Sequence, residues 1–311
     1  MGCSLCPLKC GADRSSGYGR CTSGNGMRVS AIVVHKGEEP PLITGAGSGA
    51  VFFTGCPLKC PYCQNREISH NHLGCSITTE KLSLYLLELQ DMGCSNINLI
   101  TPTHYANELI LSLEVAKNSG LFIPVMLNSS GYENIDTIRM LIPYIDLYLM
   151  DIRYGDNQSG NTIGGVPDYW DTAMDAVEYI WQKKGPIKVD KTGCAVSGLI
   201  VRHLILPGML SNPLSVLDFL ACLSLKIPVS LLAQYNPTFY TGTVNEMKRR
   251  ITQEEYQSVL NRALELGFET IYSQDVDSYE NYAPDFRNPH PFGEGINLLL
   301  RDNMRLDKSP F

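Results

Sequence analysis

Short apolar segments alternate with amphipathic segments from residue 49 to residue 275. This alternation is the pattern of repeated βα units, which place parallel strands in one sheet and helices outside it. The chain is therefore predicted to be an α/β protein built around a parallel sheet. The expected strands are 49–54, 96–101, 122–127, 145–150, 199–206 and 228–235, with a short seventh at 269–273.

Capping residues mark the expected starts of three helices. Thr78 or Thr79 can cap a helix whose apolar residues recur at three- and four-residue spacing through residue 92. Thr252 and Glu255 have the spacing of a capping box, and Gly267 would end the helix that follows them. Asn212-Pro213 is expected to open a further helix.

Six βα units are fewer than the eight that close a full barrel. We therefore expect a partial (β/α)6 barrel at 49–275, with functional groups at the C-terminal ends of its strands. A doubly wound open sheet is the alternative. A Cys-rich segment at 1–48 would precede the barrel, and a tail at 276–311 would follow it. The Tyr-, Asn- and Pro-rich part of that tail, 279–291, is expected either to lie over the barrel or to be disordered.

Composition narrows the possible partners. The chain has 25 basic and 32 acidic residues, a net charge of −7, which argues against a nucleic-acid or anionic-lipid surface. It contains no apolar run near the roughly 20 residues that span a bilayer, and no signal-peptide stretch at its start, so we expect a cytoplasmic protein. Thiols stay reduced there, so 11 cysteines favour metal ligation or redox chemistry over disulfides.

Three cysteines follow the first expected barrel strand. Cys56, Cys60 and Cys63 have the spacing C-x3-C-x2-C. Three thiolates on one tight loop can hold three irons of a cubane cluster and leave the fourth iron open to another ligand. Paired C-x2-C knuckles are more typical of zinc, so a zinc turn, or cysteines that only pack, is the less favoured interpretation.

With Tyr62 directly before the third cysteine, this motif resembles that of the radical S-adenosylmethionine (SAM) superfamily. The resemblance implies that Cys56, Cys60 and Cys63 bind a [4Fe-4S] cluster, that SAM binds the open iron, and that Tyr62 lies against the adenine. It also implies an oxidoreductase that cleaves SAM reductively to a 5′-deoxyadenosyl radical, which takes hydrogen from a substrate. A flavodoxin- or ferredoxin-type protein would supply the electron.

From residue 49 to residue 275 the chain is similar to the pyruvate formate-lyase activating enzymes and their uncharacterised relatives. This similarity implies that polar residues at successive strand ends bind SAM, with Arg202 pairing with a carboxylate, although each of them alone could instead belong to a surface salt bridge. Thr101-Pro102-Thr103 departs from the family's Gly-Gly-Glu-Pro type turn, so Thr101 and Thr103 would supply hydroxyl acceptors. The other implied cofactor-binding residues are Asn128, Ser130, Asp151 and Arg153.

The remaining cysteines form two groups. Four precede the barrel with the spacing C-x2-C-x3-C-x10-C, which suits zinc or a second iron–sulfur cluster, with unpaired surface thiols as the alternative. They are Cys3, Cys6, Cys10 and Cys21. Without a metal, residues 1–28 should be poorly ordered. The other four are expected to be small apolar fillers, although Cys194 is also a candidate hydrogen-atom donor. They are Cys75, Cys94, Cys194 and Cys222.

Three functions are compatible with these features. The first is an activase that takes hydrogen from a backbone glycine of a partner glycyl radical enzyme. The second applies the same radical initiation to a peptide, nucleoside or small metabolite, and the third is a non-catalytic iron–sulfur or zinc scaffold. Only thirteen residues separate Cys63 from Ile77, so no ferredoxin-like insert fits there. The simplest activases also lack that insert, so its absence does not separate the first two functions.

Overall fold

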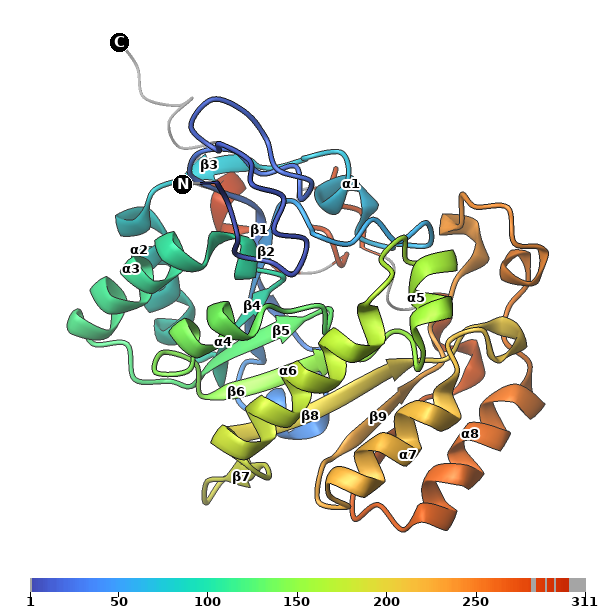
Figure 1. Ribbon diagram of the computed structural model, residues 1–311. Coiled ribbons are helices and arrows are strands. Elements are labelled where there is room, and N and C mark those ends of the chain that lie inside the picture. Colours follow the sequence, from blue (N-terminus) through green and yellow to red (C-terminus); the bar gives the residue numbers. More distant parts are fainter. Residues whose placement is uncertain (1, 281–283, 289, 294, 302–311) are drawn as a thin grey trace.

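The described part of the chain is organised around one ten-stranded mixed sheet (Figure 1). A computed structural model describes residues 2–280, 284–288, 290–293 and 295–301. The strand order is β10-β9-β8-β6-β5-β4-β2-β1-β3, and β7 pairs with β8 beside this path. The strands are β1 (Met27–His35), β2 (Ser48–Phe53), β3 (Cys75–Ile77), β4 (Asn96–Ile100), β5 (Val125–Ser129), β6 (Leu147–Asp151), β7 (Lys188–Val189), β8 (Ala195–Leu204), β9 (Val229–Leu232) and β10 (Ile271–Ser273).

The strands from β2 to β10 along this order pair in parallel, whereas β1 runs antiparallel to both β2 and β3. The two ends of the sheet, β10 and β3, do not pair with each other, so the barrel is open. The predicted α/β class and the partial barrel are confirmed. β1 belongs to this same sheet, with His35 opposite Ser48, although the expected segment boundary at 48/49 separates the two strands.

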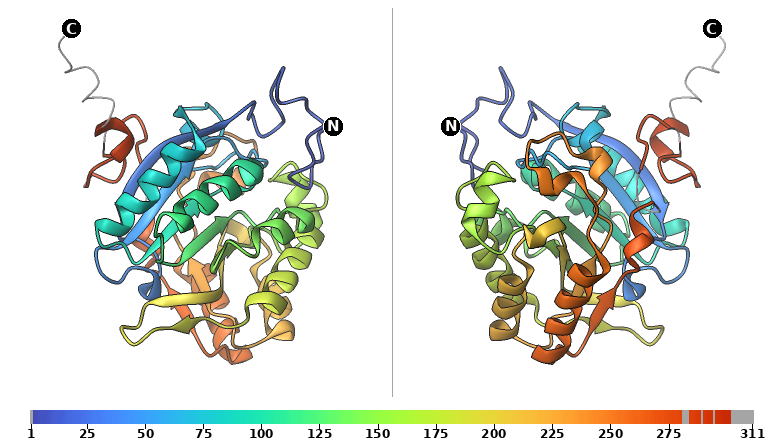
Figure 2. Two further views of the ribbon diagram at one scale, coloured as in Figure 1. Left: turned by 90° about the vertical axis from the view of Figure 1, so that its left-hand side faces the viewer. Right: turned by 90° about the vertical axis from the view of Figure 1, so that its right-hand side faces the viewer.

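Alternating side chains divide each parallel strand between two environments. In β4, Ile97 and Leu99 pack into the main hydrophobic core, whereas Asn96 and Asn98 are buried on the opposite face. Successive side chains of a strand point to opposite faces, so the apolar set meets the helices and the polar set faces the barrel interior. Figure 2 shows the helices on the outer side of the curved sheet.

Helices join the parallel strands, and their ends follow the expected capping. Thr78 Oγ1 accepts a hydrogen bond from Lys81 N at the start of α2, and the capping box of Thr252 and Glu255 starts α8. Asn212 precedes α7, but its side chain bonds to Asp156 instead of capping the helix. The helices are α1 (Arg66–Ser69), α2 (Thr79–Asp91), α3 (Ala106–Asn118), α4 (Ile135–Leu141), α5 (Asn157–Thr162), α6 (Tyr169–Lys184), α7 (Pro213–Leu223) and α8 (Gln253–Leu266).

Residues 2–26 form no helix or strand and lie against one end of the barrel. Hydrogen bonds from the start of α4 hold this segment: Asn134 Nδ2 donates to Ser4 O at 2.8 Å and Thr137 Oγ1 to Leu5 O at 2.7 Å. Arg20 donates to Gly165 O at 3.0 Å from the same segment. These hydrogen bonds to the barrel therefore hold residues 2–26 in position.

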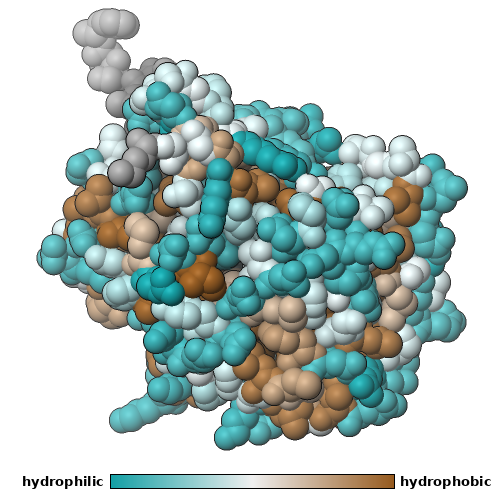
Figure 3. Space-filling view, in the orientation of Figure 1, coloured by the Kyte–Doolittle hydropathy of each residue, from teal (hydrophilic) through white to brown (hydrophobic). Residues whose placement is uncertain are grey.

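The surface mixes polar and apolar side chains. Figure 3 shows hydrophobic residues gathered toward the bottom of the face that carries α6 and α7. Among the helices of the described residues, none combines the length and apolar character needed to cross a bilayer.

Candidate functional site

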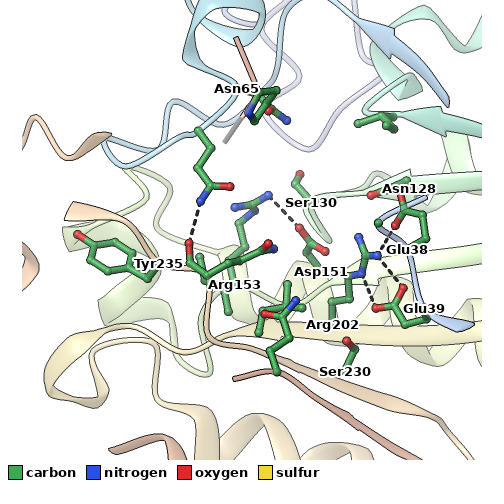
Figure 4. Close-up of a pocket in the computed structure, with 18 of the residues that line it drawn as sticks. Glu38, Glu39, Asn65, Asn128, Ser130, Asp151, Arg153, Arg202, Ser230 and Tyr235 are labelled. Carbon is green, nitrogen blue, oxygen red and sulfur yellow. Dashed lines mark hydrogen bonds and ion pairs between the residues drawn. The ribbon is translucent and has the colours of Figure 1, made fainter. Parts of the chain in front are cut away.

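A pocket of about 330 Å³ lies at the C-terminal ends of the parallel strands. Parallel strands present these ends at one edge of the sheet, so residues far apart in the sequence meet there. Figure 4 shows Asn128, Asp151, Arg153 and Arg202 converging on it, with Asn65 on the opposite side. Of the predicted cofactor-binding residues, the pocket is lined by Tyr62, Thr101, Asn128, Ser130, Asp151, Arg153 and Arg202.

The loop between β2 and α1 carries Cys56, Cys60 and Cys63. Gln64 Nε2 donates to Gln234 O at 2.8 Å, and Cys63 lines the pocket. Burial raises the pKa of Cys56, and the neighbouring charges of Cys60 and Cys63 raise it further. The three thiols are therefore close enough to affect one another, and their thiolate forms need a positively charged partner.

The donor set of this loop fits an iron–sulfur cluster better than a single ion. Among the described residues, no three His, Cys, Asp or Glu side chains are placed to share one metal ion. Each thiolate of a cubane cluster binds its own iron, so the sulfur atoms need not converge on one point. Cys56, Cys60 and Cys63 would hold such a cluster, and Cys63 would place it at the wall of the pocket.

Asp151 ends β6, and Arg153 follows two residues later. Arg153 Nη2 donates to Asp151 Oδ2 at 3.0 Å, and the two side chains are 24% and 22% exposed. Burial raises the pKa of Asp151, while the charge of Arg153 opposes that rise. Asp151 Oδ1 and Arg153 Nε have no hydrogen-bond partner among the described residues. Both side chains line the pocket, so the pair brings a negative and a positive group to its wall.

Arg202 of β8 has a different partner from the one expected. Its Nε donates to Glu39 Oε1 at 2.7 Å and its Nη2 to Glu39 Oε2 at 2.6 Å, and Nη2 also pairs with Glu38. Burial opposes the ionisation of Glu39, but Arg202 outweighs it and holds the pKa of Glu39 below its ordinary value. The carboxylate partner of Arg202 in this structure is thus the chain's own Glu39. The expected pairing of Arg202 with a cofactor carboxylate stays a prediction, and Arg202 does line the pocket.

The turn after β4 separates the two predicted threonines. Thr101 has a φ of 55°, donates its N–H to Asn128 O at 2.8 Å and lines the pocket. Thr103 begins the short helix Thr103–Tyr105, is 1% exposed and does not line the pocket. The expectation that Thr103 contacts the cofactor is therefore wrong, because the tight turn directs the chain into the core.

Cys194 lies at the wrong end of the sheet for a hydrogen-atom donor. It precedes β8, and its thiol lies 3.7 Å from Ser95 O, directly before β4. The pocket is formed at the other end of these strands, by Thr101 after β4 and by Arg202 near the end of β8. The expected donor role of Cys194 is therefore wrong, while its burial agrees with the apolar-filler interpretation.

Sequence reasoning missed the loop that follows β1 as part of the site. Glu38 and Glu39 line the pocket, and so does Ser230 of β9. The Glu38-Glu39-Pro40-Pro41 run marks this loop in the sequence. Its position next to β8 depends on the pairing of Glu39 with Arg202, which are far apart in the sequence. Local sequence patterns do not reveal such a pairing.

The four N-terminal cysteines lie near one another in the segment 2–26. A Cβ atom on Gly19 would be 3.4 Å from both Cys10 Sγ and Cys21 Sγ. Burial raises the pKa of Cys6 to about 11, and the charges of Cys21 and Cys10 add to this rise. The backbone of Cys3 forms hydrogen bonds with that of Gly11 and Ala12, both at 3.0 Å, which brings Cys3 close to Cys10 in the chain.

The two cysteine groups also touch. Cys56 N donates to Cys21 O at 3.2 Å. This bond joins the N-terminal segment to the first cysteine of the loop between β2 and α1, the cluster loop. Lys59 Nζ donates to Thr22 Oγ1 at 3.2 Å and to Ser69 O at 2.8 Å. The N-terminal segment therefore packs directly on the loop that would hold the cluster.

Part of the C-terminal segment reaches the pocket. Pro284 and Phe292 line it, and the Phe292 ring centroid lies 4.5 Å from that of His35 and 5.4 Å from that of Phe52. Within the expected tail, residues 281–283, 289, 294 and 302–311 lie outside the described residues. The described part places aromatic side chains at one edge of the pocket.

Part of the chain is similar in sequence to known proteins. The sequence profile of the radical SAM superfamily matches residues 50–192. An uncharacterized protein of Methanocaldococcus jannaschii is 25% identical over 280 residues, which cover 87% of this chain and 76% of that protein. The pyruvate formate-lyase-activating enzyme of Clostridium pasteurianum is 28% identical over 162 residues, covering 48% of this chain and 65% of that enzyme.

Two solved structures are also similar. A domain of a pyruvate-formate lyase-activating enzyme from Bacteroides vulgatus has a TM-score of 0.40 at 15% identity, over 55% of this chain and 92% of that one. The FeFe-hydrogenase maturase HydG from Carboxydothermus hydrogenoformans has a TM-score of 0.46 at 12% identity, over 81% of this chain and 63% of that one. Residues 50–192 of this chain thus match the radical SAM superfamily, and the chain resembles the pyruvate formate-lyase-activating enzymes in sequence.

Proposed function

We propose that this protein binds a [4Fe-4S] cluster at Cys56, Cys60 and Cys63, and binds SAM in the adjoining pocket, to start radical chemistry on a substrate. The observation that carries this proposal is the position of the cysteine loop at the wall of a polar pocket formed by strand ends. The cluster and SAM would together supply a hydrogen-abstracting carbon radical when reduced. A flavodoxin- or ferredoxin-type protein is the proposed electron donor.

The chain's own residues would bind and orient the cofactor. Asp151 and Arg153 line the pocket with opposite charges, so the pair can hold polar groups of opposite character. Asn128 and Ser130 add polar groups at the end of the neighbouring strand. Tyr62 contributes a buried aromatic wall beside the cysteine loop, which fits the proposed contact with adenine.

For the substrate, we propose the backbone glycine of a partner enzyme as the first candidate. Its support is the 28% identity to an enzyme named as an activator of pyruvate formate-lyase. A peptide, nucleoside or small metabolite is the second candidate, and the C-terminal segment favours it. Pro284 and Phe292 occupy one edge of the pocket, which leaves less room for a loop of another protein.

The N-terminal cysteines are proposed to hold a second metal, either zinc or another iron–sulfur cluster; a cluster fits better, because no three of the described ligand side chains are placed to share one ion. The support is that Cys6, Cys10 and Cys21 lie close enough for their charges to interact and that Cys3 is tied to the same loop. Metal analysis of the reconstituted protein checks this proposal. We expect iron or zinc in excess of one [4Fe-4S] cluster per chain. The double variant Cys6→Ser, Cys21→Ser should lose this additional metal.

Radical initiation is tested by anaerobic reconstitution with iron and sulfide, reduction, and assay for 5′-deoxyadenosine formed from SAM. Wild-type protein should form the product and Cys60→Ala should not. Cys222→Ala is the matched control, because Cys222 is exposed on α7, outside the pocket. Equal product from Cys60→Ala and wild type would contradict the proposal. A full cluster without any product would favour the scaffold function instead.

A further inference from the structure

Tyr62 and Tyr154 form a hydroxyl pair beside the cysteine loop. Tyr62 lies between Cys60 and Cys63 and lines the pocket, and its hydroxyl donates to Tyr154 Oη at 2.9 Å. Tyr62 is 4% exposed and Tyr154 is fully buried. One phenol thus borders the pocket, and a second one lies behind it within hydrogen-bonding distance.

Other aromatic rings enclose this pair. The ring centroid of Tyr169 lies 5.1 Å from that of Tyr154 in an edge-to-face arrangement, and Tyr132 stacks on Tyr169 at 6.0 Å. Tyr235 packs edge-to-face against Tyr62 at 5.9 Å. Because these rings are buried, water has little access to the two hydroxyl groups.

Stability does not by itself explain two hydroxyls at this place. Replacing both partners of a buried hydrogen bond by apolar groups of the same shape is close to neutral for folding. Two phenylalanines would therefore fill the space of Tyr62 and Tyr154 without burying polar atoms. The hydroxyl pair instead places two readily oxidised groups next to the site of proposed radical chemistry.

We propose that Tyr62 and Tyr154 form a hydrogen-atom relay that quenches a carbon radical left in the pocket without substrate. This inference rests on the proposed function, which supplies that radical. In the first step the O–H bond of Tyr62 breaks, a C–H bond forms on the carbon radical, and a neutral phenoxyl radical remains on Tyr62. The phenolic O–H bond is weaker than the alkyl C–H bond that replaces it, so the step is downhill.

In the second step a hydrogen atom crosses the 2.9 Å contact from Tyr154 to Tyr62. The O–H bond of Tyr154 breaks, that of Tyr62 forms again, and the unpaired electron ends on Tyr154. Each step moves one proton and one electron together, so the sequence needs no further oxidant or reductant. The oxidised group is then a fully buried side chain, away from the pocket.

The relay is tested with the reconstituted full chain, SAM and dithionite, in D₂O and without substrate or added thiols. Because buried phenolic hydrogens exchange slowly with solvent, the protein is kept in D₂O from reconstitution onward; carbon-bound hydrogens do not exchange. Wild-type protein should therefore form 5′-deoxyadenosine that carries solvent deuterium. Electron paramagnetic resonance of the same sample should show a phenoxyl radical, and its hyperfine pattern should narrow when the protein contains ring-deuterated tyrosine.

Three variants locate the relay. Tyr62→Phe keeps the ring and should lose both the solvent deuterium and the phenoxyl signal. Tyr154→Phe should keep the deuterium, but its radical should sit on Tyr62 with an altered hyperfine pattern. Tyr148→Phe is the control, because Tyr148 is buried in β6, outside the pocket, and should match wild type.

The outcomes separate this inference from the proposed function. Deoxyadenosine with equal solvent deuterium in wild type and Tyr62→Phe would overturn the relay and leave radical initiation standing. A phenoxyl signal unchanged in Tyr62→Phe would do the same. Absence of deoxyadenosine from every variant, wild type included, would instead overturn the proposed function and the relay with it.

Discussion

Glu39 and Arg202 form a bidentate ion pair across the floor of the pocket, although 163 residues separate them in the sequence (Figure 4). Their side chains are 4% and 14% exposed, so water screens the pair weakly. The pair attaches the loop after β1 to β8. It therefore determines the shape of the pocket floor as well as its charge.

Removing one partner of this pair should be costly. Glu39→Gln leaves Glu38 as the ion-pair partner of Arg202 within the described part of the chain, and breaking a buried pair costs about 3–5 kcal/mol. We expect a loss toward the lower end of that range in urea denaturation, because Glu38 remains. The double variant Glu39→Gln with Arg202→Met should recover part of the loss. If Glu39→Gln is as stable as wild type, the pair does not hold the loop.

The carboxylate of Asp151, which lines the pocket, should matter for SAM binding. Asp151→Asn removes the negative charge of the side chain and one of its two acceptor oxygens, while the side chain keeps its shape. A hydrogen bond to a charged group contributes about 1.5–3 kcal/mol, so affinity should fall by roughly tenfold or more. Isothermal titration of reconstituted protein with SAM measures this. Asp136→Asn, on an exposed side chain of α4, is the control, and an equal loss there would show a non-specific charge effect.

Stability should fall as the pH drops below 6.5, in part because of His203. This side chain is buried between Ile152 O and Ser211 Oγ, and burial lowers its pKa from 6.5 to about 4. The folded state thus keeps His203 neutral, whereas the unfolded chain takes up a proton below 6.5. Its contribution is complete above pH 6.5 and is lost toward pH 4, at about 1.4 kcal/mol per pH unit.

Urea denaturation at several pH values between 4 and 7 measures this contribution. His203→Gln removes the titrating group, so its unfolding free energy should depend less steeply on pH than that of wild type. Identical slopes for the two proteins would show that His203 does not titrate on unfolding.

Gly55 should be needed for the contact between the N-terminal segment and the cluster loop. Its φ is 85°, and a Cβ atom would lie 2.6 Å from both Cys21 O and Ser23 Oγ. Gly55→Ala should therefore lower both thermal stability and iron content after reconstitution. Gly120→Ala is the control, because φ is 103° there and no atom lies within 4 Å of the added Cβ. Backbone strain alone, about 1–2 kcal/mol, should be its whole effect.

If Gly120→Ala loses as much iron as Gly55→Ala, the steric contact with Cys21 is not the cause. If both retain iron, the N-terminal segment does not support the cluster loop. Iron content is thus the measurement that separates the clash from the general effect of a left-handed residue.

Local patterns determined the fold class and the ends of many elements. Alternating apolar and amphipathic segments predicted the parallel strands, and Thr78, Thr252 and Gly267 predicted where helices begin or end. These features depend on neighbouring residues along the chain, such as side chains that cap the nearest free N–H groups. The spacing of the cysteines likewise indicated the superfamily whose profile matches residues 50–192.

Tertiary structure decided which polar groups meet. Arg202 is paired with Glu39, Thr103 turns into the core, and Cys194 lies at the far edge of the sheet. Strand direction determines at which end of the sheet a residue lies, and the desolvation of a charge requires the partner that packing brings near it. Both depend on residues distant in sequence, so the sequence alone predicts the chemistry of this chain better than the contacts within its pocket.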